Sequence, residues 1–337
     1  MMNFIQKHNI QITIAIFSLI FCACVSGSRA RSHGDDVCGI CGKDLGWVNI
    51  VSEGKQYHPD CFDNHSELQC SVCKKPIFDK YAKDNDSIYH ITCFKETKLK
   101  RCSVCNLPME GEYITDLWGQ ATHKNHKDQP AGICDSCGRI ICPASLNGVK
   151  YQDGRLTCGI CKTTAVMDEK TVRPVMVELT KLFEKKGIGP FSLKRIHVSL
   201  VDSKTLDSEY KTGNMRNKRG ETQTAIITRN GETLNWSHQI RVQYGLHLTV
   251  FKGILAHEML HVWLNENKVK MSNKEIEGFC NLGIMLVNEN ENSDISKVLQ
   301  QNLEQNPDEV YGDGYRLMKT RLGKLGWPKL ISQVKKR

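Results

Sequence analysis

Cysteine pairs recur at a fixed spacing along the first half of the chain, and this repeat constrains the fold more than any other feature. Cys-x-x-Cys pairs begin at Cys38, Cys70, Cys102 and Cys134, each 32 residues after the last. A second pair of cysteines or histidines follows each one after 16 to 20 intervening residues. Two such pairs supply the four ligands of a closed, tetrahedral zinc site with little more than a β-hairpin between them. The four predicted structural sets are Cys38, Cys41, His58 and Cys61; Cys70, Cys73, His90 and Cys93; Cys102, Cys105, His123 and His126; and Cys134, Cys137, Cys158 and Cys161.

A disulfide framework is the alternative explanation for the 16 cysteines. It does not explain why histidines occupy four of the second-pair positions. Zinc explains both residue types and leaves only Cys22, Cys24, Cys142 and Cys280 outside the four sets. Closed sites of this kind fold a region that has too little hydrophobic core of its own.

The first 30 residues have the pattern of a targeting segment. Lys7 and His8 precede an apolar stretch over 10–25, and small residues follow. We expect a signal peptide or an N-terminal anchor, which places the protein outside the cytoplasm as a secreted, periplasmic or membrane-anchored protein. Lipid attachment at Cys24 is an alternative, and a cytoplasmic location follows if the leader is not functional.

The net charge of +9 raises the question of nucleic-acid binding. Twelve zinc-bound thiolates and four zinc ions would lower the charge to about +5, and a fifth zinc would restore it to about +7. Lysine and arginine are scattered, and no basic cluster carries aromatic residues beside it. The sequence therefore predicts no nucleic-acid partner.

After Cys161 the pattern changes to that of a mixed α and β domain. Apolar residues recur at helical spacing from Val172 to Phe183, and they alternate with polar ones over 196–200 and 240–244. Asn230-Gly231 between two apolar runs predicts a hairpin. A long apolar helix is expected from Val250 to Leu264.

That helix carries His257-Glu258-Met259-Leu260-His261. Histidines four residues apart stack on one helical face, so both imidazoles can bind one metal. Glu258 then lies beside the remaining coordination position, where it can take a proton from zinc-bound water and give it to a leaving amine. The pattern predicts a catalytic zinc site with His257 and His261 as ligands and Glu258 as general base.

A third protein ligand is expected from the next helical stretch. Glu275 and Glu277 both lie there, and residues two apart point to different sides of a helix, so only one of them can face the metal. We favour Glu277, because Gly278 beside it would allow close approach to the active-site helix. Cys280 is interpreted as a small buried hydrophobic residue.

The segment from Tyr311 to Arg316 has two interpretations. Gly312 and Gly314 would allow a sharp turn that brings Tyr311 to the site to stabilise an oxyanion, or Asp313 to orient a histidine. The alternative is a capped start of a helix over 315–322 with Asp313 near its N-terminus.

Two resemblances follow from these motifs. The paired zinc modules, residues 38–93 and a divergent 102–161, resemble LIM domains, although eight and seven residues separate the fingers within them. The order of these modules, the helix around His257, Glu277-Gly278-Phe279-Cys280 and Tyr311-Gly312-Asp313-Gly314 resembles the LIM-domain zinc peptidases that limit organ growth in plants, with their bacterial relatives. The plant members of that family are ubiquitin-activated endopeptidases. The resemblance implies a similar activity for this chain, with His257, His261 and Glu277 as zinc ligands and Glu258 as general base. An exported protein would not meet ubiquitin, so ubiquitin is a partner by resemblance alone.

Together these observations predict an α+β chain: tandem LIM-like zinc modules followed by a zincin-like peptidase domain over 165–337. We expect about four structural zinc ions and one catalytic zinc, with Tyr311 as a further catalytic candidate. Protein substrates, and protein partners bound by the LIM-like modules, are the expected partners. The alternative is a non-catalytic LIM-type interaction protein in which the zincin domain is a silent scaffold.

Overall fold

A computed structural model of the chain describes most residues from Val37 onward. The described residues are the short strands β1 (Gln6–His8) and β2 (Ile14–Ala15) and the ranges 37–52, 55–63, 68–75, 77, 80–124, 132–145, 147–207, 218–229 and 232–337. The predicted leader at 1–30 lies outside them apart from these two strands, so export stays a prediction. In the described parts of the chain, no helix combines the length and the apolar composition needed to cross a bilayer.

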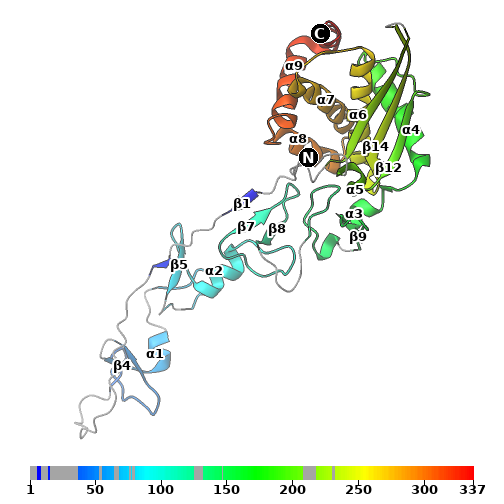
Figure 1. Cartoon of the computed structure of the whole chain (residues 1–337). Coiled ribbons are helices and arrows are strands. Elements are labelled where there is room, and N and C mark those ends of the chain that lie inside the picture. The colour runs from blue at the N-terminus through cyan, green and yellow to red at the C-terminus, as the bar shows by residue number, and fades with distance from the viewer. Residues whose placement is uncertain are drawn as a thin grey trace. The chain divides into compact units, whose positions relative to one another are not determined.

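The described residues fall into two compact units (Figure 1). The smaller unit contains residues 37–102 and 106–113, and the larger unit contains 103–105 and 114–337.

The smaller unit repeats a hairpin followed by a short helix. The first copy consists of β3 (Ile50–Ser52), β4 (Lys55–Tyr57) and α1 (Pro59–Asp63), and the second of β5 (Tyr81–Asp84), β6 (Ser87–His90) and α2 (Ile91–Lys98). Both hairpins are antiparallel. The predicted histidine ligand directly follows the hairpin in the first copy and is its last residue in the second, and the helix carries the predicted cysteine three residues later. The sequence repeat is therefore also a structural repeat.

Short elements open the larger unit and surround two further cysteine pairs. They are β7 (Tyr113–Thr115), β8 (Ala121–His123), the 3-10 helix η1 (Pro143–Ser145), β9 (Val149–Lys150), β10 (Leu156–Thr157), α3 (Gly159–Lys162) and β11 (Ala165–Val166). Strand β10 pairs antiparallel with β9. Strand β11 pairs antiparallel with β15 (Leu246–His247), which lies directly before the helix that carries His257 and His261.

A three-stranded sheet in the order β12-β14-β13 forms one layer of the larger unit. The antiparallel pairing of β13 (Gly220–Arg229) with β14 (Glu232–Gln243) confirms the predicted hairpin, and Asn230 and Gly231 between them lie outside the described residues. Strand β12 (Ile196–Val201) pairs parallel with β14. In the chain, β12 is preceded by the 3-10 helix η2 (Glu169–Thr171) and by α4 (Val172–Glu184). Helix α5 (Ser203–Asp207) follows β12.

Four helices complete the larger unit: α6 (Leu248–Glu266), α7 (Asn273–Glu291), α8 (Asp294–Glu304) and α9 (Tyr311–Lys335). Helix α6 is buried around most of its circumference, as expected for a central helix. It packs against the β13–β14 hairpin and against α7, which in turn packs against α9 (Figure 1). Ser272 and Glu275 form a capping box that starts α7.

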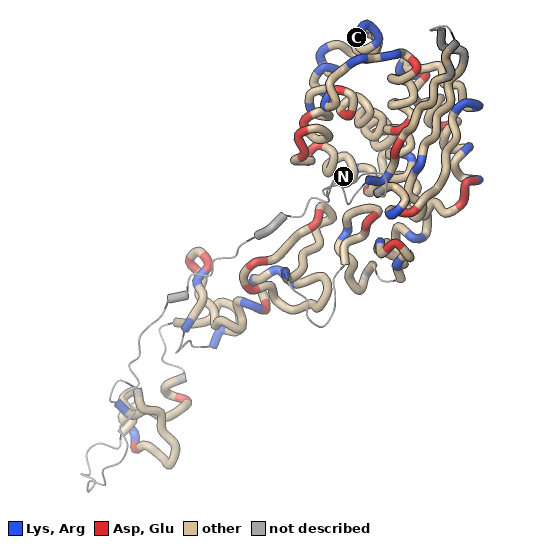
Figure 2. Tube along the Cα trace, in the orientation of Figure 1, with Lys and Arg blue, Asp and Glu red and all other residues tan. Residues whose placement is uncertain are grey.

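Helix α9 begins at Tyr311, four residues before the predicted start. Asp308 accepts hydrogen bonds from the backbone N–H groups of Val310 and Tyr311, so it satisfies donors at this end. Gly326 has a positive φ and kinks the helix, and beyond the kink the chain ends in Lys335, Lys336 and Arg337 (Figure 2).

Glycines allow α7 to approach its neighbours closely. A Cβ atom on Gly278 would lie 2.1 Å from the carbonyl oxygen of Gly314, so this glycine makes room for α9. The prediction that Gly278 faces the active-site helix is therefore wrong, and Gly283 fills that role, since its Cβ would lie 3.1 Å from the carbonyl oxygen of Ala256. Both Gly312 and Gly314 lie within α9 and form no sharp turn. Gly314 makes room for the backbone of α7, and Gly312 makes room for the carbonyl oxygen of Asn306 in the segment before α9.

Candidate metal centres

The first two predicted ligand sets both belong to the smaller unit. Within each set, the ligand atoms lie within 4.8 Å of one another. His58 Nδ1 lies 3.3 Å from Cys41 Sγ, and His90 Nδ1 lies 3.3 Å from Cys73 Sγ. The other ring nitrogen of His58 lies 2.8 Å from the carbonyl oxygen of Asp44, which accepts its hydrogen bond. That bond leaves Nδ1 free to bind a metal.

The third set is described in part. Cys105 and His123 lie in the larger unit, with His123 Nδ1 3.5 Å from Cys105 Sγ. Cys102 belongs to the smaller unit and stays a predicted ligand. His126, its predicted fourth member, lies outside the described residues, so its role as a ligand stays a prediction.

The fourth set is the most buried. Cys134, Cys137, Cys158 and Cys161 are all buried and cluster within the larger unit. Cys137 Sγ and Cys158 Sγ lie 4.0 Å apart, close to the edge of about 3.8 Å expected between thiolates at a Zn–S distance of about 2.3 Å. Every described cysteine is a free thiol, so no disulfide joins any of these sulfurs. The spacing suits a tetrahedral metal site.

Helices α6 and α7 bring His257, His261 and Glu277 to one point. The Nε2 atoms of the two histidines lie 3.1 Å apart, and Glu277 Oε2 lies 3.1 Å from the first and 3.6 Å from the second. Three ligands about 2.0–2.1 Å from one zinc ion would be separated by edges of about 3.3 Å. Although it is buried, Glu277 Oε2 has no hydrogen bond of good geometry among the described residues. An orphaned carboxylate oxygen that faces two imidazole nitrogens fits a bound cation.

Glu275 has different partners. Arg321 Nη1 donates a 2.6 Å hydrogen bond to Glu275 Oε1, and Arg337 Nη1 donates a 2.5 Å bond to the same oxygen. Burial acts to raise the pKa of Glu275, but the bonds from Arg321, Ser272 and Arg337 outweigh it and lower the pKa to about 2. This carboxylate ties α7 to the C-terminal helix and is not in the metal cluster.

Strand β13 holds the side chain of Glu258. Thr222 Oγ1 lies 2.8 Å from Glu258 Oε2, and a Cβ atom on Gly220 would lie 2.8 Å from Glu258 Oε1. Only a residue without a side chain leaves room there for the carboxylate. Thr222 and Gly220 were not singled out from the sequence, because only the pairing of β13 with α6 brings them to this place.

Asn281 orients the first histidine. Its Oδ1 lies 2.9 Å from His257 Nδ1, and its Nδ2 donates a 3.0 Å hydrogen bond to the carbonyl oxygen of Tyr311. The amide oxygen thus accepts the Nδ1 proton, which leaves His257 Nε2 with its lone pair toward the cluster. Asn281 was missed in the sequence, although its position four residues after Glu277 places it on the same face of α7.

The Tyr311 segment meets the site through its backbone. Asp313 pairs with Arg316 and lies 3.3 Å from Lys274 Nζ, so its carboxylate orients neither histidine. One contact of Tyr311 with the site is the hydrogen bond that its carbonyl oxygen accepts from Asn281. A catalytic role for the phenol stays a prediction.

Cys280 also lies near the two histidines. Its sulfur is within 4.8 Å of their ligand nitrogens, and the residue is fully buried. Burial, together with the charges of Glu277 and Glu258, raises the pKa of this thiol well above its usual value. The full burial of the residue agrees with its interpretation as a small buried hydrophobic residue.

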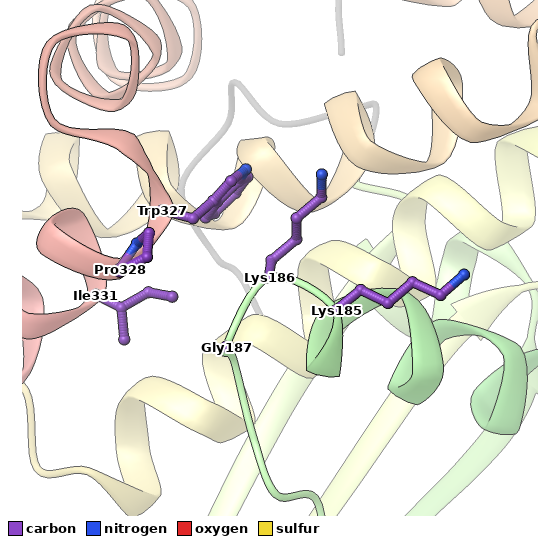
Figure 3. A pocket seen from close by; sticks show the side chains of 6 residues that line it. All are labelled: Lys185, Lys186, Gly187, Trp327, Pro328 and Ile331. Carbon is purple, nitrogen blue, oxygen red and sulfur yellow. The ribbon is translucent and has the colours of Figure 1, made fainter.

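A pocket opens at the kink of α9, lined by Lys185, Lys186, Gly187, Trp327, Pro328 and Ile331 (Figure 3). None of these residues belongs to a metal cluster. The pocket therefore contributes nothing to the candidate sites.

The Cys/His clusters among the described residues are of a kind that could bind zinc. No protein-family model matches the chain. The chain is similar to Protein DA1 from Arabidopsis thaliana, with 24% identity over 274 residues, covering 65% of this chain and 51% of that protein. It is also similar to LIM domain-containing protein HDR3 from Oryza sativa subsp. japonica, with 27% identity over 286 residues, covering 76% of this chain and 56% of that protein.

A third relative, Protein DA1-related 2 from Arabidopsis thaliana, is 27% identical over 282 residues, which is 72% of this chain and 52% of that protein. These relatives confirm the resemblance inferred from the motifs. The chain spans about half the length of the curated relatives it matches.

Proposed function

We propose that this protein is a zinc-dependent endopeptidase with a zincin-like catalytic domain. The observation that carries the proposal is the set of distances between His257, His261 and Glu277, which match the edges of a tetrahedral zinc site. The sequence resemblance to the LIM-domain zinc peptidases of plants supports the same activity.

A zinc ion held there would supply Lewis acidity, polarising the scissile carbonyl and lowering the pKa of the attacking water. Glu258 is the general base: its carboxylate receives the proton of the attacking water and returns it to the leaving nitrogen. Thr222 holds one carboxylate oxygen, and the open space at Gly220 leaves room for the other. This fixed geometry keeps the base in position throughout the reaction.

Strand β13 offers a place for the substrate. It lies at the edge of the described sheet and contacts α6, so an extended peptide paired with it would run beside Glu258. Backbone pairing of this kind suits a protein substrate and places no demand on one particular side chain.

The LIM-like modules are proposed to bind proteins, as the name of the rice relative suggests by its LIM domain. Trp47, Val48 and Val51 of the first module are strongly exposed. Large apolar side chains gathered on a surface are typical of a protein-binding site.

The test is a mass-spectrometric search for new peptide ends after the zinc-loaded protein is incubated with a mixed protein pool. Glu258→Gln is the matched control, because it keeps the shape and the metal ligands but removes the base. Cleavages that appear only with the wild type support the peptidase. If both proteins bind zinc and neither cleaves, the modules are the active part and the alternative of a silent scaffold is favoured.

A further inference from the structure

The turn between Cys134 and Cys137 is bonded to the strand that holds Glu258. The two residues inside this Cys-x-x-Cys turn are Asp135 and Ser136, and their carbonyl oxygens both accept hydrogen bonds from the guanidinium of Arg219. The bond to Ser136 measures 3.1 Å. Arg219 is buried, with 9% of its surface exposed, so water cannot readily replace these bonds.

Arg219 stands at the start of β13, directly before the residues that position the base. Gly220 follows it, and Thr222, two residues further, bonds to Glu258. The carbonyl oxygen of Arg219 accepts a 2.9 Å hydrogen bond from the backbone N–H of Gln243, which fixes it to β14 as well. A shift of Arg219 therefore moves the part of β13 that touches the carboxylate.

The same turn is bonded to the start of α6. Ser136 Oγ accepts a 2.8 Å hydrogen bond from the backbone N–H of His247, and the His247 side chain caps α6 by accepting from Thr249 N. Ser136 is almost fully buried. One zinc-finger turn thus contacts both the helix that carries Glu258 and the strand that positions it.

A closed Cys₄ site holds its turn only while the metal is bound, because metal binding and local folding are coupled. We propose that the Cys134–Cys161 zinc site is a metal-dependent anchor for the catalytic base. Bound zinc fixes the positions of the Asp135 and Ser136 carbonyl oxygens, and the hydrogen bonds of Arg219 to these oxygens fix the strand that positions Glu258. Arg219 is a positioning residue that acts through Gly220 and Thr222. The inference rests on the proposed peptidase function for its catalytic consequence.

The test compares Arg219→Met with Arg155→Met in the full-length, zinc-loaded protein. Arg155 is also buried and also joins the finger to the end of β14, since its Nη1 donates a 2.8 Å bond to the carbonyl oxygen of Tyr244 and lies 3.4 Å from Gln243 Oε1. Its side-chain hydrogen bonds go to Asp153, Gln243 and Tyr244, and not to the residues of β13. Methionine keeps much of the side-chain volume and removes the donors in both variants. Comparing the two variants therefore distinguishes the effect of losing the Arg219 link to β13 from the effect of losing any contact between the finger and the sheet.

We expect Arg219→Met to keep its zinc content, to lower kcat about 10- to 100-fold, and to shift the pH profile of kcat. Its β13 amides should exchange with solvent at least about tenfold faster. Arg155→Met should keep kcat per folded molecule and the exchange rates of β13. Equal losses of kcat in the two variants, or unchanged β13 exchange in Arg219→Met, would overturn the proposal.

The metal dependence is tested with Cys161→Ser, which removes a ligand and leaves the Cys134–Cys137 turn chemically intact. Loss of one zinc should speed β13 exchange as Arg219→Met does, whereas loss of zinc with β13 still protected would contradict the anchor. If the cysteine variant does not fold, β13 exchange of the wild type with and without its zinc makes the same comparison. Hydrogen exchange needs no substrate, so a wild type that cleaves nothing would refute the peptidase while these exchange measurements still decide the anchor.

Discussion

Asn281 Oδ1 lies 2.9 Å from His257 Nδ1, and this contact fixes which nitrogen of the imidazole can bind a metal. The amide is held in turn by the carbonyl oxygen of Tyr311, which accepts from its Nδ2. The first turn of α9 thus supports a ligand on α6 through a side chain of α7. The three helices form one unit around the candidate catalytic metal.

Asn281→Ala should lower zinc affinity at the His257 site about 10- to 100-fold, because the imidazole loses its orienting acceptor. The measurement is a competition titration with a chelator of known affinity. Asn288→Ala is the matched control, since Asn288 is another buried asparagine of α7, bonded to Gln300 and not to a histidine. Equal affinities for the wild type and Asn281→Ala would contradict the role of Asn281.

Glu277→Gln and Glu275→Gln differ in position by only two residues and should behave differently. The first removes a predicted ligand, so the loss of zinc affinity should exceed the roughly 10- to 100-fold expected for an outer partner. The second should leave zinc content unchanged and cost about 1–3 kcal/mol of stability, because it weakens charge-assisted bonds to a carboxylate that is only 12% exposed. Metal analysis after dialysis distinguishes them, and loss of zinc from Glu275→Gln alone would assign the third ligand to that residue.

Gly220→Ala tests the space beside the general base. The new Cβ would lie 2.8 Å from Glu258 Oε1 and 2.7 Å from Ile254 Cγ2, so the carboxylate must move. We expect kcat to fall about 10- to 100-fold with zinc content unchanged. Gly323→Ala is the control, since nothing lies within 4 Å of its Cβ position, and a Gly220→Ala enzyme as fast as that control would refute the effect.

Gly278→Ala should destabilise the larger unit by about 3 kcal/mol or more, because its Cβ would meet the backbone of Gly314 at 2.1 Å. Gly323→Ala should instead stabilise α9 by about 0.5–1 kcal/mol, since alanine loses less entropy in a helix. Urea denaturation of the zinc-loaded proteins measures both. Equal midpoints for the wild type and Gly278→Ala would mean that α7 and α9 do not pack this closely.

Zinc binding at the His261 site should weaken in acid. Burial acts to lower the pKa of His261, but the contact with Glu277 and the charge of Glu258 outweigh it and raise the pKa. Metal binds the neutral imidazole, so affinity is full above this raised pKa and falls about tenfold per pH unit below it for each proton displaced. Cobalt titration of protein stripped only at this site, from about pH 8 to about pH 5, should show the fall, and constant affinity would contradict it.

Local spacing was sufficient to predict some parts of this molecule. The hairpin between the ligand pairs of each of the first two modules, the β13–β14 hairpin and α6 were all expected from patterns within about twenty residues. The structure also places His257, His261 and Glu277 within contact distance, as the spacing along two helices suggested.

Other features depend on tertiary contacts that one chain segment does not reveal. Thr222 reaches Glu258 only because β13 packs on α6, and Arg219 reaches the Cys134 turn only in the folded unit. Gly278 was assigned to the wrong neighbour for the same reason: a glycine signals close approach, but the sequence does not say to which helix.

Cleavage of a protein substrate in oxygen-18 water by wild type and by Glu258→Gln tests the central claim most directly. The account predicts new carboxyl termini that carry the heavy oxygen, formed by the wild type and not by the variant, with equal zinc content in both. Labelled ends formed equally fast by Glu258→Gln, or no cleavage by wild type with zinc bound at His257, His261 and Glu277, would contradict it.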